Sequence, residues 1–77
     1  MKFEYKGFKC GDVIRIISMK GFPEDNARYA GKEGTINMID DMGNCWGNWG
    51  GLAVIPGVDK LEKIGYDPTW KYKGVHD

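Results

Sequence analysis

The alternation of apolar and polar residues along the chain predicts five short β-strands. The strongest run, residues 13–19, is rich in β-branched side chains, and apolar residues occupy both of its faces. Such a strand is expected to be covered on both sides, at least in part. Four shorter runs follow, each bounded by glycine, proline, asparagine or aspartate. They are residues 35–39, 45–49, 52–55 and 61–64.

The segments between these runs predict one long loop and several tight turns. Residues 20–31 are polar and contain Pro23, with room for one helical turn over residues 27–30. Residues 40–44 have the composition of a turn, and Gly50-Gly51 is a two-residue hairpin signal. Five short strands with a long first loop predict an all-β fold, a small SH3-like barrel.

Aromatic and charged residues alternate near both ends of the sequence, at residues 3–8 and 70–75. A period of two is typical of strands, so we expect both segments to form additional strands. Our hypothesis is that they pair with each other and pack on the barrel through Phe3, Tyr5, Trp70 and Tyr72. The predicted organisation is one domain with an N-terminal segment (1–9), a barrel (10–64) and a C-terminal segment (65–77).

The expected core consists of apolar positions within the predicted strands, because small domains have few other residues to bury. These positions are Ile14, Ile16, Ile36, Ile39, Leu52, Val54 and Leu61.

Several motifs occur in a fixed order over residues 10–64. They are Gly11-Asp12-Val13-Ile14-Arg15-Ile16-Ile17-Ser18-Met19, Gly31-Lys32-Glu33-Gly34-Thr35-Ile36, Asp40-Asp41-Met42-Gly43, Trp49, and Leu52-Ala53-Val54-Ile55-Pro56-Gly57-Val58-Asp59-Lys60. Together they resemble a family of small uncharacterised domains found mainly in bacteriophages, prophages and bacterial mobile elements. More distantly, they are similar to nucleic-acid and ribosome-associated SH3-like barrels. The resemblance implies an SH3-like fold, a phage or prophage origin and a location in the bacterial cytoplasm, but no activity.

The chain departs from that family pattern in one hairpin. Gly50-Gly51 stands where a longer turn is expected, and Trp46-Gly47 replaces residues that are more usually aliphatic or small and polar. If the longer turn has a function in members of that family, we do not expect this chain to share that function.

The charge balance bears on the partner. Eleven basic and eleven acidic side chains give a formal net charge of zero. This argues against a protein whose main task is to grip duplex DNA, which needs an excess of Lys and Arg. Residues 1–9 hold three lysines against one glutamate, and residues 60–77 hold four against three acids. A polyanion site would therefore favour the chain ends.

The sequence offers little for catalysis or metal binding, so we expect no enzyme, no cofactor and no metal. Cys10 and Cys45 have no second pair to complete a zinc site, and the single histidine is His76. Asp40-Asp41 lacks the spaced oxygen ligands of a calcium loop and is expected to form a turn. No apolar run resembles a signal peptide or a membrane span, so we expect no membrane partner. Two buried or idle thiols in a cytosolic protein are expected for Cys10 and Cys45, and a Cys10–Cys45 disulfide is the alternative.

The candidate binding residues are exposed aromatics and cations. Trp46 and Trp49 are three residues apart in a predicted strand, so their side chains point to opposite faces and at most one belongs to the deep core. The full candidate set is Trp46, Trp49, Tyr29, Phe22, Arg15 and Arg28.

We expect a non-catalytic binding module whose partner is a host or viral protein, because neutral charge suits a protein better than a polyanion. The alternatives are binding of single-stranded nucleic acid through the aromatics, or capture of a small molecule or nucleotide at the interface of a homo-oligomer.

Overall fold

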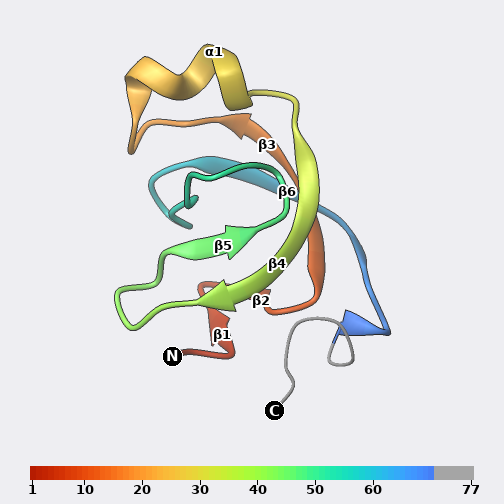
Figure 1. Ribbon diagram of the computed structural model, residues 1–77. Helices are drawn as coiled ribbons and strands as arrows, with labels where there is room; N and C mark the ends of the chain where they lie inside the picture. The colour runs from red at the N-terminus through yellow and green to blue at the C-terminus, as the bar shows by residue number, and fades with distance from the viewer. Residues whose placement is uncertain (71–77) are drawn as a thin grey trace.

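The structure of the protein, a computed structural model, describes residues 1–70. It is mostly β, as predicted, with an antiparallel sheet in the order β5-β4-β3-β6 and a separate two-stranded hairpin, β1-β2 (Figure 1). The strands are β1 (Glu4–Tyr5), β2 (Phe8–Lys9), β3 (Asp12–Ser18), β4 (Glu33–Ile39), β5 (Cys45–Gly47) and β6 (Lys60–Tyr66). A 3₁₀ turn, η1 (Pro23–Asp25), and a short helix, α1 (Asn26–Tyr29), occupy the long first loop.

Strand β3 lies inside the sheet, between β4 and β6. Ile14 and Ile16 on one of its faces are fully buried, whereas Ile17 on the other face is 39% exposed. The second face of this strand is therefore covered only in part. Its pairing with β6 shifts register after Val13 and again after Ile16. Such bulges increase the local twist and curve the sheet.

The strand predicted over residues 52–55 is reduced to a single bridge. Val54 and Cys45 exchange two backbone hydrogen bonds of 2.8 and 2.9 Å. The next amide, of Ile55, donates instead to the Asp59 carboxylate at 2.7 Å. The prediction of a complete strand is wrong here, because a side chain takes the donor that the strand ladder would need.

The preceding strand also ends early. It was expected to reach Trp49 and turn at Gly50-Gly51, but β5 ends at Gly47. The Asn48 side chain accepts a hydrogen bond from the Thr35 amide at 2.8 Å, in the place where a backbone carbonyl would continue the ladder. The expected two-residue hairpin is therefore replaced by a wider loop.

The core largely confirms the prediction. Ile14, Ile16, Ile36, Ile39 and Val54 are fully buried. Leu52 and Leu61 are half-buried and pack against this cluster. Aromatic and sulfur-containing residues complete the core: Cys10, Met19, Tyr29, Cys45, Trp49 and Trp70.

The N-terminal segment is a hairpin rather than the single strand that the alternation predicts. Tyr5 of β1 pairs with Phe8 of β2, and the chain turns at Lys6 and Gly7, with φ of 50° and 86°. The side chain of Trp70 is buried, and its ring meets that of Phe3 edge to face at 6.2 Å. Residues 71–75 of the second predicted terminal strand lie outside the described residues.

None of the helices within residues 1–70 has the length and apolar character needed to cross a membrane.

Candidate functional site

Three of the six expected binding residues meet in one cleft. Arg28 and Tyr29 come from α1, and Trp49 comes from the loop after β5. Lys32, Gly50 and Gly51 complete the lining of a cavity of about 430 Å³. We call these six residues the loop cleft.

The loop cleft depends on a close approach between Tyr29 and Gly50. A Cβ built at Gly50 would lie 2.7 Å from Cε1 of the Tyr29 ring, and Gly50 has φ of 148°. Both facts favour glycine, because a side chain would clash and that backbone conformation is strained for other residues. Gly51, by contrast, has open space where a side chain would stand.

Trp49 forms the rigid floor of this region. Its indole Nε1 donates to the Leu52 carbonyl at 2.7 Å, and the residue is 4% exposed. Its ring packs over the backbone of Gly47, where a Cβ would come within 2.2 Å of it. The expectation that at most one of the two tryptophans belongs to the deep core is confirmed, because Trp46 is 36% exposed.

The polar groups of the loop cleft are donors and cations. Arg28 pairs with Asp25 at 3.1 Å, and its guanidinium lies 5.6 Å from the centre of the Tyr29 ring. Within residues 1–70, Lys32 has no ion pair and the Tyr29 hydroxyl has no hydrogen-bond partner. The lining residues include no carboxylate, and because Arg28 is paired with Asp25 just outside the lining, the net positive charge of the loop cleft comes from Lys32.

The other three expected residues lie elsewhere. Phe22 is partly buried and packs against the core. The Trp46 indole donates to Asp40 at 3.3 Å, beside the turn that the sequence predicts there. Arg15 is held between Glu33 at 2.8 Å and Glu62 at 3.0 Å, and the hydrogen bond that its guanidinium donates to Glu33 raises the pKa of Arg15 above its usual value. Its charge is therefore already neutralised by neighbouring strands.

Asp59 fixes the first loop, and sequence reasoning missed it. Its buried carboxylate accepts the backbone N–H groups of Lys20 and Gly21 at 2.7 and 2.8 Å, and of Ile55 at 2.7 Å. The carboxylate thus ties the start of the loop to the segment after β5. The only feature of the local sequence that pointed to a special role for Asp59 was the Pro56-Gly57 turn just before it.

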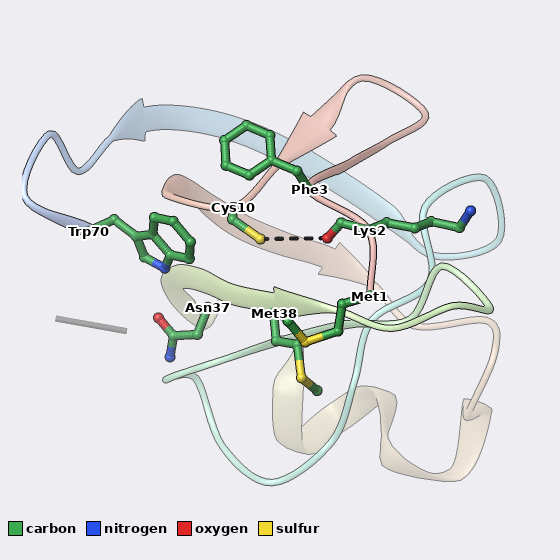
Figure 2. Close-up of a pocket in the computed structure, with 7 residues that line it drawn as sticks. All are labelled: Met1, Lys2, Phe3, Cys10, Asn37, Met38 and Trp70. Atoms are coloured by element: carbon green, nitrogen blue, oxygen red, sulfur yellow. Dashed lines mark hydrogen bonds between the residues drawn. The ribbon is translucent and has the colours of Figure 1, made fainter. Parts of the chain in front are cut away.

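A second cavity, of about 340 Å³, lies beside the N-terminal hairpin and is mostly apolar. Its lining residues are Met1, Lys2, Phe3, Cys10, Asn37, Met38 and Trp70. Figure 2 shows the rings of Phe3 and Trp70 on one side of it and the side chains of Met1 and Met38 on another. The Trp70 indole Nε1 is buried and has no hydrogen-bond acceptor within residues 1–70. We call this cavity the terminal groove.

Comparison with known proteins identifies a family and no relative of known activity. No curated protein and no solved structure matched the sequence. The family described as a domain of unknown function (DUF4314) matches residues 2–64, which includes the β1-β2 hairpin together with the whole of the main sheet apart from the end of β6. The chain therefore belongs to the DUF4314 family.

Proposed function

We propose that the protein is a non-catalytic binding module that takes an extended, acidic segment of a partner protein in the loop cleft. The observation that carries this proposal is the convergence of Arg28, Tyr29 and Lys32 on one cavity whose lining has no carboxylate. A carboxylate of the partner would meet Lys32, it would share Arg28 with Asp25, and it would accept from the Tyr29 hydroxyl, which has no hydrogen-bond partner among residues 1–70.

The glycines of the cleft suit an extended chain. The Tyr29 ring covers Gly50, but Gly51 has open space where a side chain would stand, so a partner backbone can approach the loop closely at Gly51. Trp49 is held by packing and by its hydrogen bond to the Leu52 carbonyl, and Tyr29 is held by packing, so the wall they form is already ordered before a partner binds. An ordered wall lowers the conformational entropy lost on binding.

The burial of the rings favours a protein over a nucleic acid at this site. Trp49 is 4% exposed and Tyr29 is 7% exposed, so neither offers a free ring face to a base. Single-stranded nucleic acids bind largely by stacking bases on exposed rings. The loop cleft instead offers ring edges, a hydroxyl and cations.

The resemblance to phage and prophage domains supports a host or viral protein as the partner, in the bacterial cytoplasm. We also propose that the fold is SH3-like. The long first loop beside the loop cleft supports this assignment, because SH3-like barrels have a long loop at the same place. Fold-level likeness by itself supplies no partner.

The test is a fluorescence-anisotropy titration with a labelled short peptide of alternating glutamate and proline. We expect saturable binding that weakens at least tenfold in the double variant Arg28→Gln/Lys32→Gln. The matched control is Lys20→Gln/Lys60→Gln, which removes the same charge outside the cleft. Equal binding of a peptide with glutamine in place of glutamate, or equal losses in both double variants, would refute the proposal.

A further inference from the structure

We propose that a second surface, separate from the loop cleft, binds single-stranded nucleic acid. It is formed by the β1-β2 hairpin and the end of β6, and Figure 1 places this hairpin and helix α1 at opposite ends of the main sheet. We call it the basic aromatic face. Its residues are Lys2, Phe3, Tyr5, Lys6, Phe8, Lys9, Lys63 and Tyr66.

A buried carboxylate positions two of the lysines. Lys9 and Lys63 reach the two oxygens of Asp12 at 3.1 and 3.2 Å, and Asp12 is fully buried. Burial raises the pKa of the Asp12 carboxyl, but hydrogen bonds from the Lys9 backbone and from both ammonium groups outweigh it and hold the pKa below its usual value. One negative charge therefore holds two positive ones in fixed positions, and the trio keeps a net positive charge.

Three rings of the basic aromatic face have an ammonium group over them. Lys9 lies 4.5 Å from the centre of the Tyr66 ring, and Lys63 lies 5.9 Å from that of Phe8. Lys2 and Lys6 lie 5.7 and 5.5 Å from the centre of the Tyr5 ring. These contacts interleave cations with aromatic rings across residues that are far apart in the sequence.

Two of the lysines are unpaired. Within residues 1–70, neither Lys2 nor Lys6 forms an ion pair, and the turn at Lys6 and Gly7 presents Lys6 at the tip of the hairpin. The carboxylates nearby are Glu4 on β1, Asp12, Asp41, which pairs with the amino group of Met1, and Asp67, which follows Tyr66 and donates its backbone N–H to the Gly11 carbonyl. The face therefore keeps a modest positive charge in a chain whose formal net charge is zero.

Two rings of this face are exposed, unlike those of the loop cleft, whereas Tyr5 and Phe8 are partly buried and pack against the core. Phe3 is 58% exposed and Tyr66 is 48% exposed. They are linked through Trp70, since Phe3 meets the Trp70 ring at 6.2 Å and a Cβ at Gly11 would touch both Tyr66 and Trp70. Proteins that bind single strands of any sequence use exposed rings, on which bases stack, and cations that contact the phosphate backbone. This face offers both.

The terminal groove adds a place for one unstacked base. It opens beside Phe3 and Lys2, and its cavity of about 340 Å³ exceeds the volume of a nucleobase. The Trp70 Nε1–H is buried there without an acceptor within residues 1–70. A carbonyl or ring nitrogen of a base would supply that acceptor, and an orphaned buried donor costs free energy until it is satisfied.

The modest charge points to single strands rather than duplex. Duplex DNA carries two phosphates per base pair and rewards dense arrays of Lys and Arg, and its bases are not free to stack on protein rings. Four lysines with two well-exposed rings suit a strand of a few nucleotides.

The test measures binding of fluorescein-labelled oligothymidine and oligouridine over a range of salt concentrations. We expect saturable binding, with log K falling by about 0.7 per neutralised phosphate for each decade of salt. Lys2→Gln/Lys6→Gln should reduce that slope by about 1.4, because two phosphate contacts are lost. Arg28→Gln/Lys32→Gln is the control and should leave the slope unchanged.

The aromatic part is tested separately. Tyr66→Leu keeps an apolar side chain over Gly11 but removes the ring, and we expect the affinity to fall roughly 5- to 100-fold. Trp70→Phe keeps a ring but removes the N–H, and we expect a loss of several-fold. Thermal melts of both variants report whether the fold is retained.

Three results would overturn the inference. They are no saturable binding of either oligonucleotide, equally tight binding of polyglutamate of matched charge, or an equal loss in the loop-cleft double variant. Because the two sites share no residue, the oligonucleotide and peptide titrations fail independently of each other.

Discussion

The ring of Tyr29 lies so close over Gly50 that a Cβ at Gly50 would come within 2.7 Å of it. This contact joins the end of helix α1 to the loop after β5, and the two residues are 21 positions apart in the sequence. The contact determines the shape of the loop cleft, because it sets the distance between helix α1, which carries Arg28, and the loop that contains Gly50 and Gly51.

Replacing Gly50 with alanine is therefore expected to displace Tyr29. The clash and the φ of 148° should together lower the free energy of unfolding by about 1–3 kcal/mol, and binding of the acidic peptide should weaken with it. Urea unfolding and anisotropy titration measure the two effects. Gly51→Ala is the matched control, because a Cβ there meets nothing within 4 Å. Equal effects of the two substitutions would contradict this account of the cleft.

Asp59 should be a major contributor to stability. Its carboxylate accepts three backbone N–H groups, and Asp59→Ala would leave these partly buried donors without that acceptor. We expect the free energy of unfolding to fall by roughly 3 kcal/mol or more. Asp59→Asn keeps one acceptor oxygen, so its free energy of unfolding should lie between those of the wild type and the alanine variant. A loss below about 0.5 kcal/mol for Asp59→Ala would show that the loop is not held in this way.

The buried carboxylate of Asp12 predicts a defined pH dependence. Its pKa in the folded state lies below the unfolded value of about 3.9, so the stabilisation is present above roughly pH 4. It is lost as the pH falls through the lower folded-state value. Melting temperatures of the wild type and Asp12→Asn should therefore differ at neutral pH and converge in acid.

The comparison isolates Asp12, since Asp40 and Asp41 also have lowered pKa values but are present in both proteins. A difference in melting temperature that stays constant from pH 7 down to about pH 2 would contradict the assigned role.

The core thiols should be inert in the folded protein. Burial raises the pKa of Cys45 to about 12, and burial also raises that of Cys10. The thiolate is the reactive form, so a thiol-reactive disulfide reagent at pH 8 should modify Cys45 slowly. The Cys10→Ser variant allows Cys45 to be followed alone, and denaturant should make its reaction fast. A native-state rate equal to the denatured-state rate would mean that Cys45 is accessible.

The central sheet was predictable because its strands follow from local patterns. The β-branched run that forms β3 and the apolar positions of β4 needed no tertiary information. The strand expected over residues 52–55 failed for a tertiary reason, since Asp59 captures the Ile55 amide. Periodicity does not show which distant carboxylate will take a backbone donor.

The candidate sites were predictable only in part. Sequence reasoning placed Arg28, Tyr29 and Trp49 among the contact residues, and the fold brings these three together. The sequence alone did not show that Arg15 forms ion pairs with Glu33 and Glu62, because these two residues come from the strands on either side of β3. The basic excess at the chain ends was visible, but the meeting of Lys9 with Lys63 depends on how β6 pairs with β3.

The most direct test of the loop cleft is an amide-correlation NMR titration of the labelled protein with the glutamate–proline peptide. The account predicts saturating shifts at Arg28, Tyr29, Lys32, Gly50 and Gly51, with the β1-β2 hairpin unmoved. Spectra that stay unchanged at high peptide excess, or shifts confined to the hairpin, would contradict it.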